Sequence, residues 1–374
     1  MNKYFDEIKK NFGFGCMRLP MRPDGEVDVE ETKKMVDLFI AGGFNYFDTA
    51  HGYLGKRSEA AVKAALTSRY PRESYILADK LTGHFFDSED GIRPLLDKQL
   101  EICGVDYFDF YLMHAQNRDV YAKFKRCRAY ETAFELKKEG KVRHVGLSFH
   151  DTPDVLDTIL TEYPEIEVVQ IQFNYLDYDD PAIESRECYE VCIRHDKPII
   201  IMEPVKGGNL INLPDKAKAL VDGAGISPAN LAVRFAASPK NVFMVLSGMS
   251  NTDQVRENIA FMSDFKPLTE RECDIAAQIA AIIRGQNLIP CTACHYCTDG
   301  CPMKISIPDL FACYNIKQQF SDNWNARYYY DKVYTSHGGK ASECIGCGQC
   351  EAACPQHLEI RQLLEKVASM FEGK

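Results

Sequence analysis

From about residue 12 to residue 250 the chain alternates between two patterns of apolar and polar positions. Short runs rich in Phe, Tyr, Ile and Val are each followed by a longer stretch in which apolar residues recur at helical spacing. The short runs predict strands at Phe12–Leu19, Phe44–Thr49, Tyr75–Lys80, Phe108–His114, His144–Phe149, Val168–Asn174, Pro198–Glu203 and Val242–Gly248. The longer stretches predict helices such as Glu30–Ala41, Ser58–Ser68, Gly91–Ile102, Glu131–Glu139, Pro153–Leu160, Ile183–His195, Pro228–Ala237 and Thr252–Phe261.

This repeated strand–helix order predicts parallel strands joined by helical crossovers. Eight such units within about 250 residues favour a closed (β/α)₈ TIM barrel. An open, doubly wound sheet is the alternative. Its usual G-x-G-x-x-G fingerprint is absent, because no third glycine follows Gly13 and Gly15 at the right place. A further helix at 268–285 completes a predicted barrel domain at residues 1–285.

The pattern changes at Asn287, after which cysteines, prolines and aromatics dominate. Two runs share the spacing Cys-x₂-Cys-x₂-Cys-x₃-Cys-Pro. They comprise Cys291, Cys294, Cys297 and Cys301, and then Cys344, Cys347, Cys350 and Cys354. Bacterial ferredoxins use this spacing to hold [4Fe–4S] clusters. We therefore predict two such clusters in a second domain, residues 286–374.

The spacing also predicts which cysteines share a cluster. Three thiolates with two residues between neighbouring cysteines can surround one cube. The fourth thiolate, followed by proline, is carried away at the start of a helix towards the other cube. The predicted sets are Cys291, Cys294 and Cys297 with Cys354, and Cys344, Cys347 and Cys350 with Cys301. Structural zinc is the alternative, but it prefers separated Cys-x₂-Cys pairs. The spacer has a helical pattern at Ile307–Phe320 and resembles the all-helical ferredoxin modules of respiratory iron–sulfur subunits, which implies a small, mainly helical domain.

Residues with acid–base chemistry lie at the predicted strand ends, where the active sites of barrels are built. Asp48 and Tyr53 follow the second strand. Lys80 ends the third strand and His114 ends the fourth. In this order they resemble the Asp–Tyr–Lys–His tetrad of the aldo-keto reductase superfamily, and the resemblance covers residues 10–285.

The resemblance implies the reduction of a small carbonyl substrate. A tyrosine is a weak acid at neutral pH, and a lysine cation beside it stabilises the phenolate. In this interpretation Tyr53 donates the proton, Asp48 holds Lys80 in place, and His114 orients the substrate carbonyl.

The resemblance also implies a nicotinamide cofactor, NADH or NADPH. Ser148 and Gln170 match positions that hold the nicotinamide carboxamide, and Glu257 and Asn258 match positions near the adenine.

Other cofactor positions depart from the family pattern. Phe149 and Met202 replace an asparagine and a tyrosine that contact the nicotinamide. Gly248 and Gln254 replace a lysine and an arginine that often grip the 2′-phosphate of NADPH. We therefore expect weak discrimination between NADPH and NADH.

Composition narrows the partners and the compartment. The net charge of −10 argues against a nucleic-acid partner. No apolar stretch approaches the roughly 20 residues that span a bilayer, and Met1–Lys10 lacks a signal-peptide core. The 15 cysteines are an odd number without an export signal, which argues against a disulfide framework and predicts a cytoplasmic protein.

The two kinds of cofactor differ in how they carry electrons. Nicotinamide gives up two electrons as hydride, a cluster accepts one at a time, and a flavin usually mediates between them. Three functions stay open: a carbonyl reductase with structural or regulatory clusters; a reductase whose clusters pass electrons from a partner to a bound flavin or to the substrate; and a redox-sensing or partner-docking protein with little turnover. The intact tetrad argues against the third, and the first is our working hypothesis.

Overall fold

The chain forms two compact units in a computed structural model, residues 1–207 with 229–273 and residues 208–228 with 274–374. The structure describes residues 4–179, 184–285, 288–291, 295–298, 300–319, 326–327, 329–335 and 338–373. Each unit has a hydrophobic core of its own, and the two are described separately.

The first unit is built on eight parallel strands that close into a barrel, in which each strand pairs with the next and β8 pairs with β1. The strands are β1 (Phe12–Gly15), β2 (Tyr46–Asp48), β3 (Ile76–Leu81), β4 (Phe108–Gln116), β5 (Val142–Phe149), β6 (Val168–Gln172), β7 (Ile199–Met202) and β8 (Val242–Gly248). The closed order confirms the predicted TIM barrel and excludes the open sheet.

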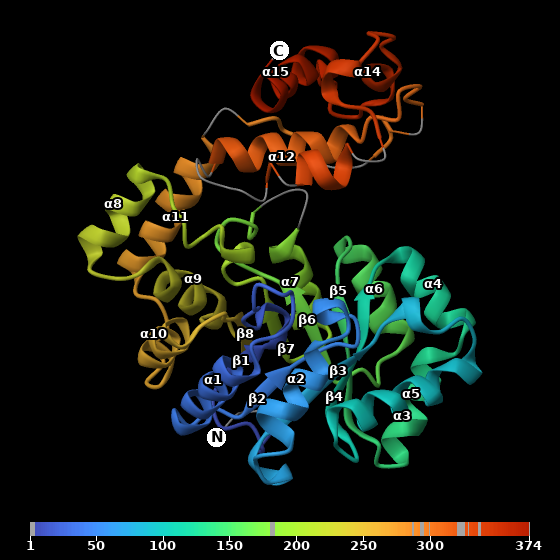
Figure 1. Ribbon diagram of the computed structural model, residues 1–374, viewed down its shortest axis with the longest axis vertical. Coiled ribbons are helices and arrows are strands. Elements are labelled where there is room, and N and C mark those ends of the chain that lie inside the picture. Colours follow the sequence, from blue (N-terminus) through green and yellow to red (C-terminus); the bar gives the residue numbers. More distant parts are fainter. Residues whose placement is uncertain are drawn as a thin grey trace. The chain divides into compact units, whose positions relative to one another are not determined.

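Helices follow the strands and surround the barrel (Figure 1). In chain order they are α1 (Val29–Ala41), α2 (Ser58–Val62), α3 (Ile92–Cys103), α4 (Arg118–Arg126), α5 (Ala129–Lys138), α6 (Pro153–Glu162), α7 (Ser185–Arg194), α9 (Pro228–Ala237) and α10 (Thr252–Met262). The second unit contains α8 (Asp215–Ala224) and most of α11 (Glu270–Arg284). The C-terminal region adds α12 (Ile307–Gln319), α14 (Gln349–Ala353) and α15 (Ile360–Glu372).

Alternate strand residues fill the barrel interior, and this register positions the site. Tyr46 of β2, Ala78 of β3 and Leu112 of β4 are fully buried in one cluster. Side chains two residues apart on a strand share a face. The next inward positions towards the carboxyl ends of these strands are Asp48, Lys80 and His114.

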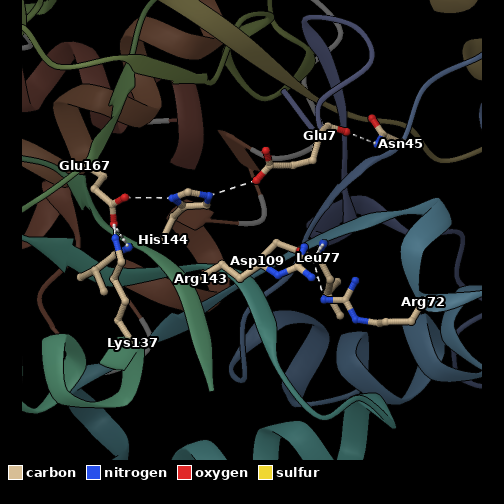
Figure 2. A network of polar contacts seen from close by, with 10 residues as sticks. Glu7, Asn45, Arg72, Leu77, Asp109, Lys137, Arg143, His144 and Glu167 are labelled. Atoms are coloured by element: carbon tan, nitrogen blue, oxygen red, sulfur yellow. Dashed lines mark hydrogen bonds and ion pairs between the residues drawn. The ribbon is translucent and has the colours of Figure 1, made fainter. Parts of the chain in front are cut away.

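The opposite end of the barrel is closed by the N-terminal segment. Phe5 packs against Phe110 and Phe243, with ring centroids 5.0 and 4.9 Å away. Around it lies the polar network of Figure 2, in which His144 contacts Glu167 at 2.9 Å and Glu7 at 3.0 Å. These contacts tie the N-terminal segment to β5 and to the residue before β6.

The C-terminal region packs α12 against α15. Leu310 and Phe311 of α12 and Val367 of α15 are buried in one hydrophobic cluster. Tyr330 stacks on Phe371 with the ring centroids 4.4 Å apart. Among the residues that the structure describes, no helix is both long and apolar enough to span a membrane.

Candidate active site and cysteine-lined cavities

Asp48 and Lys80 form a buried ion pair at the carboxyl ends of β2 and β3. Lys80 Nζ lies 2.6 Å from Asp48 Oδ1 and also donates to the Thr49 carbonyl oxygen at 2.8 Å. Burial by itself lowers the pKa of Lys80 and raises the pKa of Asp48, whereas their attraction shifts both in the opposite direction. For Lys80 the Asp48 carboxylate and the Tyr53 phenol outweigh burial, so its pKa is raised and the ammonium is kept charged.

Tyr53 lies in a short helical turn, Tyr53–Gly55, that follows β2. The Lys80 ammonium is 4.8 Å from the centroid of the Tyr53 ring. Burial raises the pKa of Tyr53, and the opposing effect of Lys80 does not cancel that shift. The phenol therefore keeps its proton at neutral pH, which suits a proton donor.

His114 is brought to the same place by a distortion of β4. The β4–β5 register shifts between Met113 and Gln116, and Ala115 has a φ of +52°. The His114 ring lies 6.0 Å from the Tyr53 ring, centroid to centroid, in an edge-on arrangement. Burial and then the charge of Lys80 lower the pKa of His114 to about 3, so the imidazole is neutral.

Thr82 orients this imidazole and was not identified from the sequence. Its hydroxyl lies 2.6 Å from His114 Nδ1, which leaves Nε2 for a substrate. The only sequence signal was its place two residues after Lys80 on the same strand face, because strand side chains alternate. All four residues of the predicted tetrad thus meet at one end of the barrel.

The predicted nicotinamide positions lie on β5, β6 and α10. Ser148 is buried, and its hydroxyl accepts a hydrogen bond from Ala115 N at 2.8 Å. Gln170 and Asn258 are 2% and 6% exposed, and Gln170 Oε1 and Asn258 Oδ1 have no hydrogen-bond partner among the described residues. Buried polar atoms are rarely left unpaired. Two free acceptors at these positions fit the carboxamide and adenine amino groups of NAD(P)H, whereas Glu257 is exposed.

The positions at which the sequence departs from the family's cofactor-binding pattern are occupied as follows. Phe149 is buried, Met202 is half-buried, and Gln254 uses its Oε1 to accept from Ser250 N at 2.7 Å. Gly248 lies under the Arg18 side chain, so that a Cβ on Gly248 would come within 2.7 Å of Arg18 Cγ. Arg18 is a cation near this position that the sequence analysis missed, because it comes from the other end of the barrel domain sequence.

The cysteines of the C-terminal region line two separate cavities. The first is lined by Cys291, Cys297 and Cys354, with apolar walls that include Phe311 and Ile360. Cys294, which was predicted to complete this set, lies outside the described residues. The fourth cysteine of the second run thus joins cysteines of the first run.

The second cavity shows the reciprocal arrangement. Its lining includes Cys301 together with Cys344, Cys347 and Cys350. Thiolates around an apolar, largely enclosed space are the donor set that iron–sulfur clusters use. One local expectation is corrected: Cys301 and Cys354 do not begin helices, since each is followed by a turn and α12 and α15 begin further along.

A closed parallel barrel with acid–base residues at the carboxyl ends of its strands is the architecture of a TIM-barrel enzyme. A model of the aldo/keto reductase family matches residues 11–281, and a model of a 4Fe-4S dicluster domain matches residues 290–358. The chain belongs to the aldo/keto reductase family of oxidoreductases and carries a 4Fe-4S dicluster domain after its barrel.

Relatives and solved structures agree with this assignment. An aldo-keto reductase of Mycolicibacterium paratuberculosis is 30% identical over 260 residues, which is 68% of this chain and 81% of that protein. The NADH-specific methylglyoxal reductase of Escherichia coli is 24% identical over 59% of this chain and 79% of its own length. The crystal structure of an aldo-keto reductase from Klebsiella pneumoniae in complex with NADPH superposes with a TM-score of 0.61 at 18% identity, covering 73% of this chain and 95% of that one. At that identity the likeness supports the fold alone.

Proposed function

We propose that this protein is a nicotinamide-dependent carbonyl reductase in which Tyr53 is the proton donor, and that its C-terminal region holds two [4Fe–4S] clusters. The observation that carries the proposal is the buried chain Asp48–Lys80–Tyr53, with His114 beside it. Its parts match the needs of carbonyl reduction, namely a protonated acid, a fixed cation and a neutral hydrogen-bond donor.

Each residue of the site has a separate proposed role in the reaction. NAD(P)H, when bound, would supply the hydride for the carbonyl carbon. Tyr53 gives its proton to the carbonyl oxygen, and Lys80 stabilises the phenolate that remains. Asp48 holds the ammonium at 2.6 Å. His114, with Nδ1 bonded to Thr82, donates from Nε2 to the same oxygen and fixes its position.

Gln170 and Ser148 are proposed to hold the carboxamide, and Asn258 and Glu257 the adenine end. The free Oε1 of Gln170 and Oδ1 of Asn258 support this assignment, because each needs a donor that the described residues do not supply.

For the clusters we propose the crossed sets, Cys291, Cys294, Cys297 and Cys354 for one and Cys344, Cys347, Cys350 and Cys301 for the other. The two cavities support this, since each contains the fourth cysteine of the other run. Bound clusters would store or transfer single electrons. We further propose a barrel domain at 1–285, a cluster domain at 286–374 and a cytoplasmic location, where thiols stay reduced.

Tyr53→Phe tests the proposed acid. With NADPH or NADH and a panel of aldehydes and ketones, we expect its kcat to fall by about 10²–10⁴-fold, since the phenol supplies general acid catalysis. Iron content and thermal stability should stay unchanged. Tyr70→Phe is the matched control, because Tyr70 donates to Asp37 away from the tetrad and should keep full activity. Near-normal turnover of Tyr53→Phe would remove Tyr53 from the mechanism.

A reductase supplied with electrons by its clusters is the second candidate. Phe149 and Met202, at positions where the family has nicotinamide contacts, favour it. It predicts a flavin, or a partner protein as electron donor, and little reduction with NAD(P)H alone. An absorbance spectrum of anaerobically purified protein separates the two candidates, because flavin and clusters absorb differently.

A further inference from the structure

A buried acidic pair lies directly behind Lys80. Asp79 precedes Lys80 on β3, so its side chain points to the opposite face of the strand, towards α2 and α3. Asp79 and Glu59 are both completely buried. One oxygen of each carboxyl group and the sulfur of Cys103 lie within 4.8 Å of one another.

Most acceptor positions of this pair are already occupied. Asp79 Oδ1 accepts from the backbone N of Lys80 at 2.7 Å and from Gln99 Nε2 at 3.0 Å. Glu59 Oε2 lies 2.7 Å from His51 Nδ1. Glu59 Oε1 is buried with no hydrogen-bond partner among the described residues. What this oxygen lacks is a proton or a cation.

Nearby cations do not supply the missing charge. The Lys80 ammonium is bound to Asp48, and burial lowers the pKa of His51, which leaves that ring neutral. Two buried carboxyl groups within 4.8 Å of each other, with no cation bound to either among the described residues, resist double ionisation, so one of them retains a proton. Burial raises the pKa of Glu59 to about 7, and burial together with the Glu59 charge raises that of Asp79 well above its usual range.

We propose that Glu59 and Asp79 share a proton and act as a positioning pair for Lys80. This inference rests on the proposed carbonyl reductase function. The pair holds Lys80 through Gln99, whose Nε2 donates to both Asp79 Oδ1 and the Lys80 carbonyl oxygen, the latter at 3.1 Å. Tyr111 OH donates to Gln99 Oε1 at 2.7 Å and thereby fixes the amide. The backbone N–H group and the carbonyl group of Lys80 are both held in this way, the first by Asp79 and the second by Gln99.

The shared proton also limits the negative charge behind the active site. A charge on Asp79 raises the pKa of Tyr53, so the state of the pair affects the proton donor through the strand. Charged and titratable groups face the pair from the β2–α2 connection, β3, α3 and β4. They are His51, Lys56, Lys80, Lys98, Cys103 and Tyr111.

The first test is an infrared spectrum of the full, cluster-loaded chain at neutral pH. A carbonyl stretch of a protonated carboxyl group should be present in the wild type and should shift or weaken in Asp79→Asn and in Glu59→Gln, since each variant removes one of the two groups that share the proton. This band needs no turnover, so it separates the two proposals. A band without reductase activity counts against the proposed function alone, and activity without the band counts against the shared proton alone. If Asp79→Asn fails to fold, Glu59→Gln decides through the same band.

The second test is the pH profile of kcat. Asp79→Asn removes the negative charge of Asp79. The alkaline limb of the profile, which reports loss of the Tyr53 proton, should therefore move down by about one pH unit. Glu59→Gln removes the group that shares the proton, so that the whole negative charge falls on Asp79 at alkaline pH, and this should move the limb up by a similar amount. A merely structural role would lower stability in both variants and leave the limb in place. That result, or a bound divalent metal that is lost in Asp79→Asn, would overturn the inference.

Discussion

At the scale of single residues, burial and charge compete at Tyr53, and burial prevails. Lysine–tyrosine proximity alone predicts a lowered tyrosine pKa, and Lys80 does act in that direction. The phenol is nevertheless buried. Loss of hydration destabilises the phenolate more than Lys80 stabilises it, so the pKa of Tyr53 rises. Tyr53 is therefore protonated before the reaction. The rate of carbonyl reduction should fall only above neutral pH, as that proton is lost.

Cofactor discrimination is also decided by single residues. Gly248 offers no cation and the Gln254 Oε1 is bonded to Ser250 N, so neither of these two positions supplies a positive charge for a 2′-phosphate. We expect Kd values for NADPH and NADH that differ by less than about a hundredfold, or about 2.7 kcal/mol. Titration of the cofactor-free protein measures both. A larger preference for NADPH would assign the phosphate to another cation, and Arg18→Gln would then test whether it is Arg18.

At the scale of elements, the periodic pattern identified all eight strands, because parallel strands buried on both faces form apolar runs. It extended the first strand too far, since Cys16–Arg18 form a helical turn beyond β1. It also missed α4, a short and highly charged helix that buries only Tyr121 and Phe124. The α15 helix was missed although its apolar residues recur at helical spacing.

Prediction of the candidate site from the sequence was limited in the same way. The tetrad was predictable because each member lies at the carboxyl end of a recognisable strand or shortly after it. Thr82 and the bulge at Ala115 were not, since they depend on side-chain contacts and on a local register shift that no periodic pattern encodes.

The closure of the barrel by its N-terminal segment should depend on pH. Burial lowers the pKa of His144, but its contacts with Glu167 and Glu7 outweigh this, and its pKa is raised. A raised folded-state pKa gives stability that is complete below about pH 6.5 and is lost as pH rises through the folded value. His144→Asn should therefore lower Tm most at acidic pH, with the difference shrinking as pH rises.

Melting curves of wild type and variant between acidic and alkaline pH measure this effect. Glu7→Gln should reduce the same pH-dependent difference in part, because it removes one of the two carboxylates (Figure 2). A Tm difference that is constant with pH would mean that His144 acts only through packing against Phe5 and Phe110.

At the scale of the whole molecule, a barrel and a cysteine-rich region follow one another in the chain, and the proposed crossed cysteine sets would make the second region one cooperative unit. If Cys301 serves the cavity of Cys344, Cys347 and Cys350, neither run can hold its cluster alone. Chelation of both clusters should then unfold the region as a whole, since metal binding provides folding free energy in small domains.

Cys301→Ser tests this arrangement. It should disturb the cluster held by the second run and leave the signal of the first, as followed by iron analysis and electron paramagnetic resonance of the reduced protein. Cys313→Ala is the matched control, because Cys313 is buried in the same region but lines neither cavity. Loss of the first-run cluster in Cys301→Ser, with the second intact, would reverse the proposed ligand sets.

The central claim is direct hydride transfer from nicotinamide to a carbonyl at the Tyr53 site, and isotope transfer tests it most directly. Anaerobic protein is given a carbonyl substrate and NAD(P)H that carries deuterium at the transferring position, and the alcohol is analysed by mass spectrometry. Our account predicts one deuterium on the carbinol carbon, because the hydride moves without exchange and Tyr53 supplies only the proton on oxygen. An alcohol whose new carbon-bound hydrogen comes from solvent would contradict it and would route the electrons through a flavin or the clusters.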